Sequence, residues 1–241
     1  MEASSPELAA ALRSLSAEPT ADHHRRVAWA YYRAGVLDVA FEHFAEAARI
    51  DPRDGWALEG MARVWRDWGT PGLGLGDAHR AVNRLPAAPE ARNTLGTILF
   101  ALGRLVEARH EFEEALRLAP GAVYALDNLC YLEITEGRSG EALAACTRAL
   151  AAAPGRAGAR NNLALARALC GDIDAAAREL ASSGKPAGSL YNRGILYLAA
   201  RRYEEAAEAF ADAARLDPAL PFVAERARQA RVLAEASRDR R

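Results

Sequence analysis

The chain has 241 residues, of which 31 are Lys or Arg, 32 are Asp or Glu and 7% are aromatic. Because these charges nearly cancel, no overall field draws the chain to nucleic acid or to an anionic membrane. No run approaches the roughly 18 apolar residues that a membrane span requires. The dominance of alanine, leucine, arginine and glutamate favours an all-α protein.

Residues 1–20 predict a short N-terminal capping helix and a linker. Ser5 is suited to the N-cap and Pro6 to the first helical position. The apolar stripe of this helix consists of Leu8, Leu12 and Leu15. The segment MEASSPELAA lacks the basic start and apolar core of a secretory signal, so we expect a cytoplasmic protein.

From residue 21 onward, glycines and prolines recur with a period of 34 residues. The glycines are Gly35, Gly69, Gly103, Gly137 and Gly171, and the prolines are Pro52, Pro86, Pro120 and Pro154, followed by Pro218. Glycine supplies the positive φ that ends one helix, and proline prevents the next from continuing. We therefore predict six helix-turn-helix blocks, at residues 21–54, 55–88, 89–122, 123–156, 157–186 and 187–218.

Small side chains recur at fixed positions of these blocks. The eighth position reads Ala28, Ala62, Gly96, Cys130, Ala164 and Gly194, and the twentieth reads Ala40, Gly74, Ala108, Ala142, Ala176 and Ala206. Small side chains let two helix axes approach, so these positions predict where the helices of a pair cross. Large residues such as Phe44, Phe112 and Phe210 are expected to fill the gaps between pairs.

Two blocks depart from the pattern. Block two contains PGLGLGD, which lacks the GK[ST] ending and preceding strand of a phosphate-binding loop. It predicts a thinly packed second helix whose missing volume is filled by Trp56, Trp65 and Trp68, although Trp56 reaching the groove is an alternative. Block five is four residues short, which predicts an early end to its second helix, either as a tolerated deletion or as a hinge.

One charged pair is predicted between blocks. Glu133 and Arg167 occupy the eleventh position of consecutive blocks, where other blocks carry large apolar or aromatic residues. We expect them to form a partly buried ion pair with Arg193 close by. Such a pair would fix register more than it adds net stability, because desolvation offsets much of the attraction.

Residues 219–241 predict a C-terminal solvating helix and a basic tail. The helix is expected from Pro221 to about Ser237. Its predicted apolar side consists of Phe222, Val223, Ala227, Ala230 and Leu233. A helix of this kind shields the last repeat from water.

The sequence contains no pattern of a catalytic or metal site. Cys130, Cys146 and Cys170 are an odd set without CxxC spacing, so we expect reduced thiols and neither a disulfide framework nor a zinc site. The five histidines are scattered without HExxH, and no GxSxG is present. We therefore predict no enzyme, no metal and no cofactor.

The blocks resemble the tetratricopeptide repeat in size, period and turn residues over residues 21–218. The segments that carry the resemblance are VAWAYYRAGVLDVAFEHFAEAARIDP, LGTILFALGRLVEARHEFEEALRLAP and RGILYLAARRYEEAAEAFADAARLDP. The resemblance implies a right-handed α-solenoid of about six repeats, whose first helices line a concave groove that receives a peptide or a partner helix. The lysines of the family's clamp for C-terminal chaperone tails are absent, so that function is not expected.

Helical phase predicts which side chains of the first helices face the groove. The predicted groove residues are Arg25, Trp29, Tyr32, Arg63, Arg66, Asn93, Thr97, Phe100, Tyr124, Asp127, Asn128, Tyr131, Asn161, Asn162, Leu165, Tyr191, Asn192, Ile195 and Leu198. Asparagine is a poor helix former, and its amide both donates and accepts, so the five asparagines are suited to gripping a peptide backbone. Alternatively, they bond only between helices. Arginines and aromatics in the first half and aliphatics in the second favour an amphipathic partner with an acidic end near Arg25, Arg63 and Arg66.

The sequence therefore predicts a protein-binding adaptor or scaffold that holds an extended or helical segment of a partner. An assembly or secretion chaperone is the alternative, and a regulatory subunit that contacts nucleic acid through Arg226 to Arg241 is a third. We expect a protein partner, no nucleic acid and no membrane. Lys185 is the only lysine, which is typical of a high-GC bacterial genome.

Overall fold

The computed structural model describes residues 6–181 and 186–238, and every regular element in these ranges is an α-helix. The helices are α1 (Pro6–Ala17), α2 (Ala21–Arg33), α3 (Leu37–Ile50), α4 (Gly55–Asp67), α5 (Pro71–Arg84), α6 (Pro89–Ala101), α7 (Leu105–Leu118), α8 (Val123–Thr135), α9 (Ser139–Ala152), α10 (Ala157–Leu169), α11 (Ile173–Ala181), α12 (Pro186–Ala199), α13 (Tyr203–Leu216) and α14 (Val223–Arg238). The predicted all-α repeat solenoid is confirmed. The predicted Ser5 N-cap and the turn at 182–185 lie outside the described residues.

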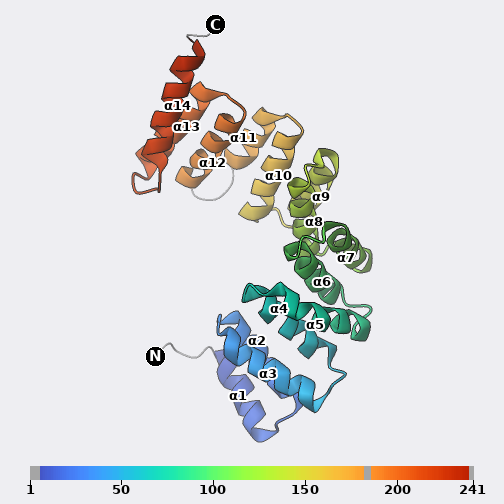
Figure 1. The fold of residues 1–241 in the computed structure, drawn as a ribbon. Coiled ribbons are helices and arrows are strands. Elements are labelled where there is room, and N and C mark those ends of the chain that lie inside the picture. The colour runs from blue at the N-terminus through green and yellow to red at the C-terminus, as the bar shows by residue number, and fades with distance from the viewer. Residues whose placement is uncertain (1–5, 182–185, 239–241) are drawn as a thin grey trace. The chain divides into compact units, whose positions relative to one another are not determined.

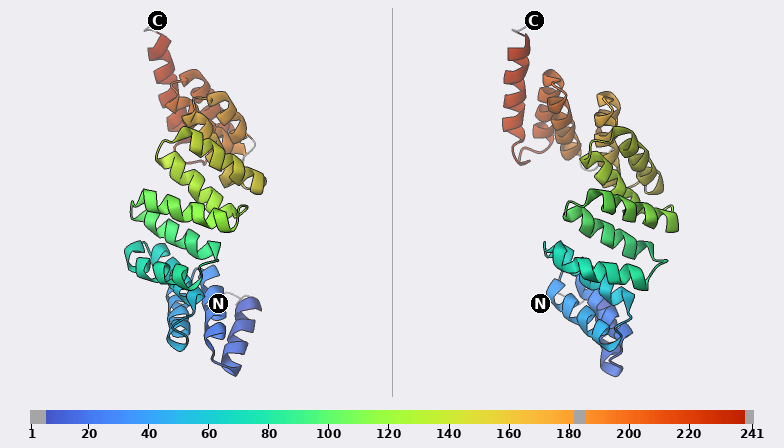
Figure 2. Two further views of the ribbon diagram at one scale, coloured as in Figure 1. Left: turned by 90° about the vertical axis from the view of Figure 1, so that its right-hand side faces the viewer. Right: turned by 45° about the vertical axis from the view of Figure 1, so that its right-hand side comes forward.

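The chain divides into two compact units, Met1–Ala125 and Leu126–Arg241, with the division inside α8. In the N-terminal unit, α2 packs on α3, α4 on α5 and α6 on α7, as successive pairs of neighbouring helices (Figures 1 and 2). The first helices also touch, α2 with α4 and α4 with α6, so one face of each contributes to a common surface. In the C-terminal unit, each helix from α9 to α14 packs on the next along the chain.

The first helix of each pair ends at a residue whose backbone has a positive φ, as predicted for the glycines. Gly35, Gly69, Gly103, Gly137 and Gly171 have φ angles of 76°, 77°, 75°, 69° and 83°. The sixth pair has no glycine there, and Arg201 adopts a φ of 58° instead. The backbone hydrogen bonds are the same, since Arg202 N–H bonds to the Tyr197 carbonyl at 2.9 Å as Arg104 N–H bonds to that of Leu99 at 2.9 Å. An L-residue is therefore held in a conformation that favours glycine.

Rings of the second helices lie directly on small residues of the first. A Cβ added at Gly96 would lie 2.6 Å from Phe112, and one added at Gly194 would lie 2.6 Å from Phe210. Both phenylalanines are fully buried. They fill the crossing within their own pair and not only the gap between pairs that the sequence predicts, so a side chain larger than hydrogen is excluded at these glycines.

The thin packing predicted for block two is wrong. A Cβ added at Gly74 would lie 2.9 Å from the Ala62 carbonyl oxygen, so α5 approaches α4 closely. Trp65 does lie against Gly74, since the added Cβ would lie 2.9 Å from Trp65 Cβ, while the Trp65 and Trp68 rings pack on Phe41 of α3 with ring centroids 4.9 and 5.4 Å away. The glycines therefore bring the helices together, and the tryptophans join consecutive pairs.

The described part of α11 ends at Ala181, and the early end predicted for the second helix of block five falls on residues 182–185, which lie outside the described residues. The C-terminal helix α14 buries Val223, Ala227, Ala230 and Ala234. Phe222, which was expected on this apolar side, is 71% exposed.

The predicted Glu133–Arg167 pair is wrong in its partners. Arg138 donates to both carboxylate oxygens of Glu133, at 2.7 and 3.1 Å. Arg167 lies 3.3 Å from the Glu179 carboxylate. Arg193 Nε is buried without a hydrogen-bond partner. Arginine side chains long enough to reach several carboxylates make repeat phase alone a poor guide to pairing.

The expectation of reduced thiols is also wrong for two of the three cysteines. Cys130 of α8 and Cys146 of α9 form a disulfide, with Cα atoms 4.9 Å apart. Cys170 is free and exposed. None of the helices in residues 6–181 and 186–238 combines the length and apolar character of a bilayer span.

Replacing Arg201 by glycine should raise the free energy of unfolding by about 1 kcal/mol, because glycine adopts this φ without a Cβ clash. Urea unfolding of the parent and the variant measures the change. The matched control is Gly103→Arg, which imposes the same strain on α6 and should lower stability by a similar amount. An Arg201→Gly variant no more stable than the parent would contradict the proposed strain.

Candidate binding surfaces

The predicted groove arginines of the N-terminal unit are all neutralised within that unit. Each forms at least one ion pair with a carboxylate on its own or a neighbouring helix. The pairs are Arg25 with Asp22 and Asp54, Arg63 with Glu59, and Arg66 with Asp67. Their positive charge is therefore compensated before any partner arrives, and the acidic partner end predicted near them loses its basis.

Glu59 lies at the centre of this surface and is completely buried on α4. Its Oε1 accepts hydrogen bonds from Arg63 Nε and from the Thr94 hydroxyl of α6, the latter at 2.6 Å. Its Oε2 is buried without a partner. Burial raises the pKa of Glu59 although the Arg63 charge opposes the shift. The free-energy cost of removing water from the carboxylate thus exceeds the stabilisation that Arg63 and Thr94 give it.

Arg66 of α4 forms hydrogen bonds to both neighbouring first helices, α2 and α6. Its guanidinium donates to the Thr97 hydroxyl of α6 at 3.1 Å and to the Tyr32 hydroxyl of α2 at 3.3 Å. Burial, together with a hydrogen bond to Asp67, raises the pKa of Tyr32 to about 12. Three predicted groove residues therefore satisfy one another, and they offer a partner few open hydrogen-bonding sites.

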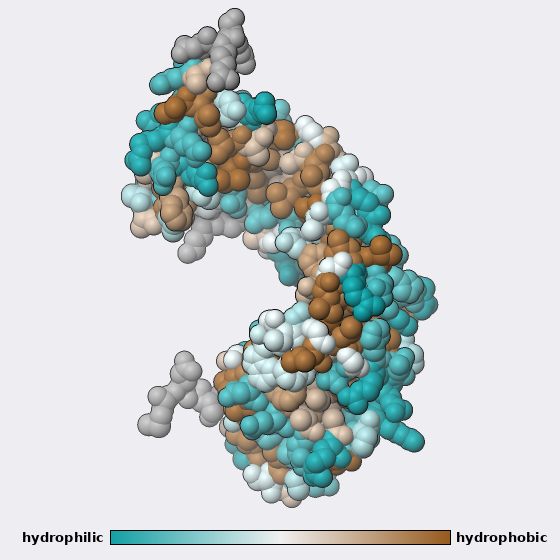
Figure 3. Space-filling view, viewed as in Figure 1, coloured by the Kyte–Doolittle hydropathy of each residue, from teal (hydrophilic) through white to brown (hydrophobic). Residues whose placement is uncertain are grey.

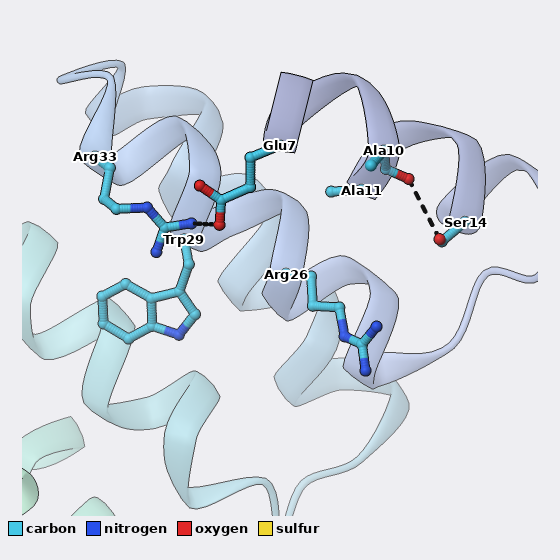
Figure 4. Close-up of a pocket in the computed structure, with 7 residues that line it drawn as sticks. All are labelled: Glu7, Ala10, Ala11, Ser14, Arg26, Trp29 and Arg33. Carbon is cyan, nitrogen blue, oxygen red and sulfur yellow. Dashed lines mark hydrogen bonds and ion pairs between the residues drawn. The ribbon is translucent and has the colours of Figure 1, made fainter. Parts of the chain in front are cut away.

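Trp29 is enclosed by aromatic and cationic neighbours. Its ring packs edge-to-face on Tyr32 and on Phe44, with centroids 5.4 and 4.9 Å apart, and the Arg63 guanidinium lies 5.3 Å from its centroid. A cavity of about 360 Å³ between α1 and α2 borders the same ring. Figure 4 shows Glu7 of α1 meeting Arg33 of α2 beside it. The capping helix thus covers one side of Trp29.

The remaining predicted residues of this unit are partly or fully covered. Asn93 is buried, and Thr97 and Phe100 are half-buried. Burial and the nearby Glu90 carboxylate raise the pKa of Tyr124 to about 12. The charges of the N-terminal face are therefore paired within the unit, and the face is largely filled by its own side chains.

The C-terminal unit carries an apolar groove, which we call the α10–α12 groove. Its volume is about 600 Å³. Its lining residues are Ile134, Asn161, Ala164, Leu165, Ala168, Leu169, Ile173, Leu180, Asn192, Ile195, Leu196, Ala199 and Ala200. None of these described lining residues is charged. Figure 3 shows hydrophobic surface over α10, α11 and α12 of this unit.

The hollow lies at a small residue of α10. Ala168 leaves space where Ile134 and Leu198 stand at the equivalent position of the neighbouring blocks. Ile173 and Leu180 of α11 contribute to the lining. The groove therefore lies where the repeat pattern is shortened.

Large aliphatic side chains at the groove remain open to water. Leu165, Leu169 and Ile195 are 48%, 43% and 38% exposed. Burying a fully exposed side chain of this kind is worth roughly 1.5–3 kcal/mol, so a partner that covers the exposed part of each gains roughly half of that. Asn161 and Asn192 add amide groups to the same lining. The arrangement is suited to an apolar segment that also presents polar backbone.

Four predicted groove residues meet here, namely Asn161, Leu165, Asn192 and Ile195. Other predicted residues of this unit have separate roles. Asp127 forms an ion pair with Arg156 at 2.7 Å. Tyr191 packs on Phe210 with ring centroids 5.5 Å apart, and Leu198 packs on a core cluster. Tyr131 is exposed, and Asn128 and Asn162 are half-buried. The sequence reasoning missed Leu169, although its thirteenth position in block five has the phase of the groove.

A sequence profile described as tetratricopeptide repeat matches residues 89–122 and 187–220, which hold the α6–α7 and α12–α13 pairs. The chain thus contains tetratricopeptide repeats at these two helix pairs. No curated protein matches the chain.

Solved structures share its fold. A chain of the APC/C hetero-tetramer Cut9-Hcn1 has a TM-score of 0.76 and 18% identity, and the match covers 93% of this chain and 46% of that one. PilW, described as a widely conserved type IV pilus biogenesis factor, has a TM-score of 0.75 and 22% identity, covering 85% and 97%. Pseudomonas aeruginosa pilF has a TM-score of 0.69 and 19% identity, and the match covers 85% of this chain and 95% of that one. The chain thus spans less than half of the length of the Cut9-Hcn1 chain that it matches.

Replacing Glu59 by glutamine should change stability in a pH-dependent way. Because the folded-state pKa of Glu59 is raised above 4.5, the parent loses stability as pH rises through that value, and the variant does not. The free energy of unfolding of the variant, relative to the parent, should therefore increase between pH about 4 and about 7, as urea titrations measure.

The matched control is Glu107→Gln on the exposed end of α7, whose carboxylate pairs with Arg104 and has a lowered pKa. It should show no such increase. A Glu59→Gln variant that becomes less stable than the parent as pH rises would mean that the Arg63 ion pair outweighs burial.

Proposed function

We propose that the chain is a protein-binding adaptor that holds a segment of a partner protein, with the α10–α12 groove of the C-terminal unit as the principal contact. The observation that carries this proposal is an uncharged hollow of about 600 Å³ lined by three large, exposed aliphatic side chains. Large exposed apolar hollows are uncommon on soluble proteins and usually mark a site that binds a protein or a ligand. Catalysis has no part in the proposal.

The groove selects its partner by polarity. A charged side chain placed against Leu165, Leu169 and Ile195 would lose water without gaining a counter-charge from the described lining. Aliphatic side chains spaced by one helical turn gain buried area there instead. The proposed partner is therefore an amphipathic segment with an aliphatic, uncharged side, and not one with an acidic end.

Other parts of the sequence-based interpretation remain proposals. The division into six repeats at 21–54 through 187–218 is supported by helix bounds that fall within each block, except that α12 begins at Pro186, the last residue of block five. The N-terminal face remains a proposed second contact. A protein rather than nucleic acid is favoured because the α14 arginines are interspersed with acidic groups and partly engaged, as Arg238 is with Glu204.

An assembly or secretion chaperone is the second candidate. It is supported by the likeness of the fold to a pilus biogenesis factor, which at 22% identity carries no partner with it. The cytoplasmic location expected from the sequence stays a prediction, and the disulfide between Cys130 and Cys146 counts against it, because such bonds persist mainly in oxidising compartments.

Selection from a phage-displayed library of random peptides of about 16 residues, long enough for about four helical turns, tests the main proposal. Enriched peptides should carry aliphatic residues at i, i+3 and i+4 spacing on an uncharged side. Leu165→Asp combined with Ile195→Asp should weaken their binding at least about tenfold, which corresponds to roughly 1.4 kcal/mol.

The matched control is Val106→Asp, at an exposed aliphatic residue of α7 outside the groove, which should leave affinity unchanged. Thermal unfolding of each variant verifies that the fold is retained. Peptides that bind the double variant as tightly as the parent would exclude the α10–α12 groove.

Replacing Asn161 and Asn192, the two asparagines that line the groove, by alanine separates the two roles left open for the asparagines. If the amides hold peptide backbone, affinity for the selected peptides should fall severalfold while the unfolding midpoint stays within about 2 °C of the parent. Fluorescence anisotropy and thermal unfolding measure the two quantities. A lowered midpoint with unchanged affinity would assign the amides to bonding between helices.

A further inference from the structure

The disulfide lies in the crossing of one helix pair. Cys130 and Cys146 are both completely buried, one on each helix of the α8–α9 pair. Sixteen residues separate them in sequence. The bond therefore closes a short loop through the turn between the two helices and is shielded from solvent in the folded chain.

The two cysteines occupy the positions at which other helix pairs pack an aromatic ring of the second helix on a small residue of the first. The eighth and twenty-fourth positions of the other blocks are Ala28 with Phe44, Ala62 with Ala78, Gly96 with Phe112, Ala164 with Leu180, and Gly194 with Phe210. Four of these five pairs place a large side chain of the second helix against a small residue of the first. Only block two has two small residues, and there Gly74 brings the helices together.

Block four has no large side chain at this crossing. Cys146 is much smaller than the phenylalanine of three other blocks, and two unbonded thiols would leave the crossing without the buried ring area seen at Gly96 and Gly194. Block four therefore differs from the other blocks at both positions of the contact, since both carry cysteine. A covalent bond between the two cysteines holds the helices together by cross-linking, as the ring does by packing in other blocks.

We infer that the Cys130–Cys146 bond is a permanent structural cross-link that replaces the ring contact, and that the C-terminal unit reaches full stability only after oxidation. The bond forms by thiol–disulfide exchange with an oxidised carrier such as a protein disulfide or glutathione disulfide. The two cysteine thiols give up two protons and two electrons, and the carrier disulfide becomes two thiols. Because both sulfurs are buried, reductants reach them only when the pair opens.

The inference places the working protein in an oxidising compartment, contrary to the location expected from its first residues. It also bears on the α10–α12 groove, since Ile134 of α8 lines it and α9 packs on α10. The cross-link does not depend on the proposed function, because it is measured by thiol content and stability without any peptide.

Thiol counting tests the bond first. The chain is purified without reductant, unfolded in urea, alkylated with iodoacetamide and weighed. One alkylated thiol, that of Cys170, is expected, against three after reduction with dithiothreitol. Without urea, dithiothreitol should leave the count at one over hours. Three alkylated thiols in the sample that was never reduced would overturn the inference.

Thermal unfolding tests the role of the bond. Parent that is reduced in urea and refolded in dithiothreitol should have an unfolding midpoint of the C-terminal unit about 10 °C below that of the oxidised parent, because the bond no longer closes the loop between the two helices. Cys130→Gly with Cys146→Phe installs the contact seen at Gly96 and Gly194, and its midpoint should be the same with and without reductant. Cys130→Ser with Cys146→Ser should match the reduced parent. A parent midpoint that reduction leaves unchanged would contradict a structural role, whether or not the variants fold.

Trapping in cells of the native host tests the compartment. Cells are quenched in acid, and their proteins are alkylated with a maleimide that adds mass to each free thiol. The chain should carry one adduct, which supports an oxidising location. Three adducts in rapidly quenched cells would show that the bond is absent where the protein works.

Discussion

The fold depends on how closely two helices approach where they cross. At Gly96 and Gly194 the absence of a Cβ lets a phenylalanine ring of the second helix lie on the first, within 2.6 Å of where a Cβ would stand. At Gly74 two backbones meet with no ring between them. At Cys130 a covalent bond joins the helices. The crossings are thus fixed by a ring on a small residue, by closely approaching backbones or by a covalent bond, and they determine which side chains are left to face outward.

The two units use the outward faces of their first helices differently. In the N-terminal unit, carboxylates and arginines on these helices neutralise one another, and Glu59 remains desolvated at their centre. In the C-terminal unit, Ala168 leaves space at an uncharged hollow edged by Leu165 and Ile195. Apolar area that stays exposed is available to a partner, whereas paired charges would first have to be separated. This contrast favours the C-terminal unit as the binding surface.

The sequence predicts helix positions well because their signals are local. Positive-φ glycines and terminating prolines act within a few residues, and the structure has the turns where they predict them. Contacts between helices were harder to predict. Glu133 bonds to Arg138 rather than Arg167, since a long side chain selects its partner by local geometry. CxxC spacing does not predict the disulfide, whose signal in the sequence is that Cys130 and Cys146 occupy the positions of Gly96 and Phe112.

Hydrogen exchange measured by mass spectrometry, with and without a library-selected peptide, tests the central claim most directly. Peptide bound in the α10–α12 groove should slow exchange in α10 and α12 and leave α2, α4 and α6 unchanged, because amides exchange more slowly where a partner holds the helices closed. Protection confined to α2, α4 and α6 would contradict the account and would assign binding to the N-terminal face.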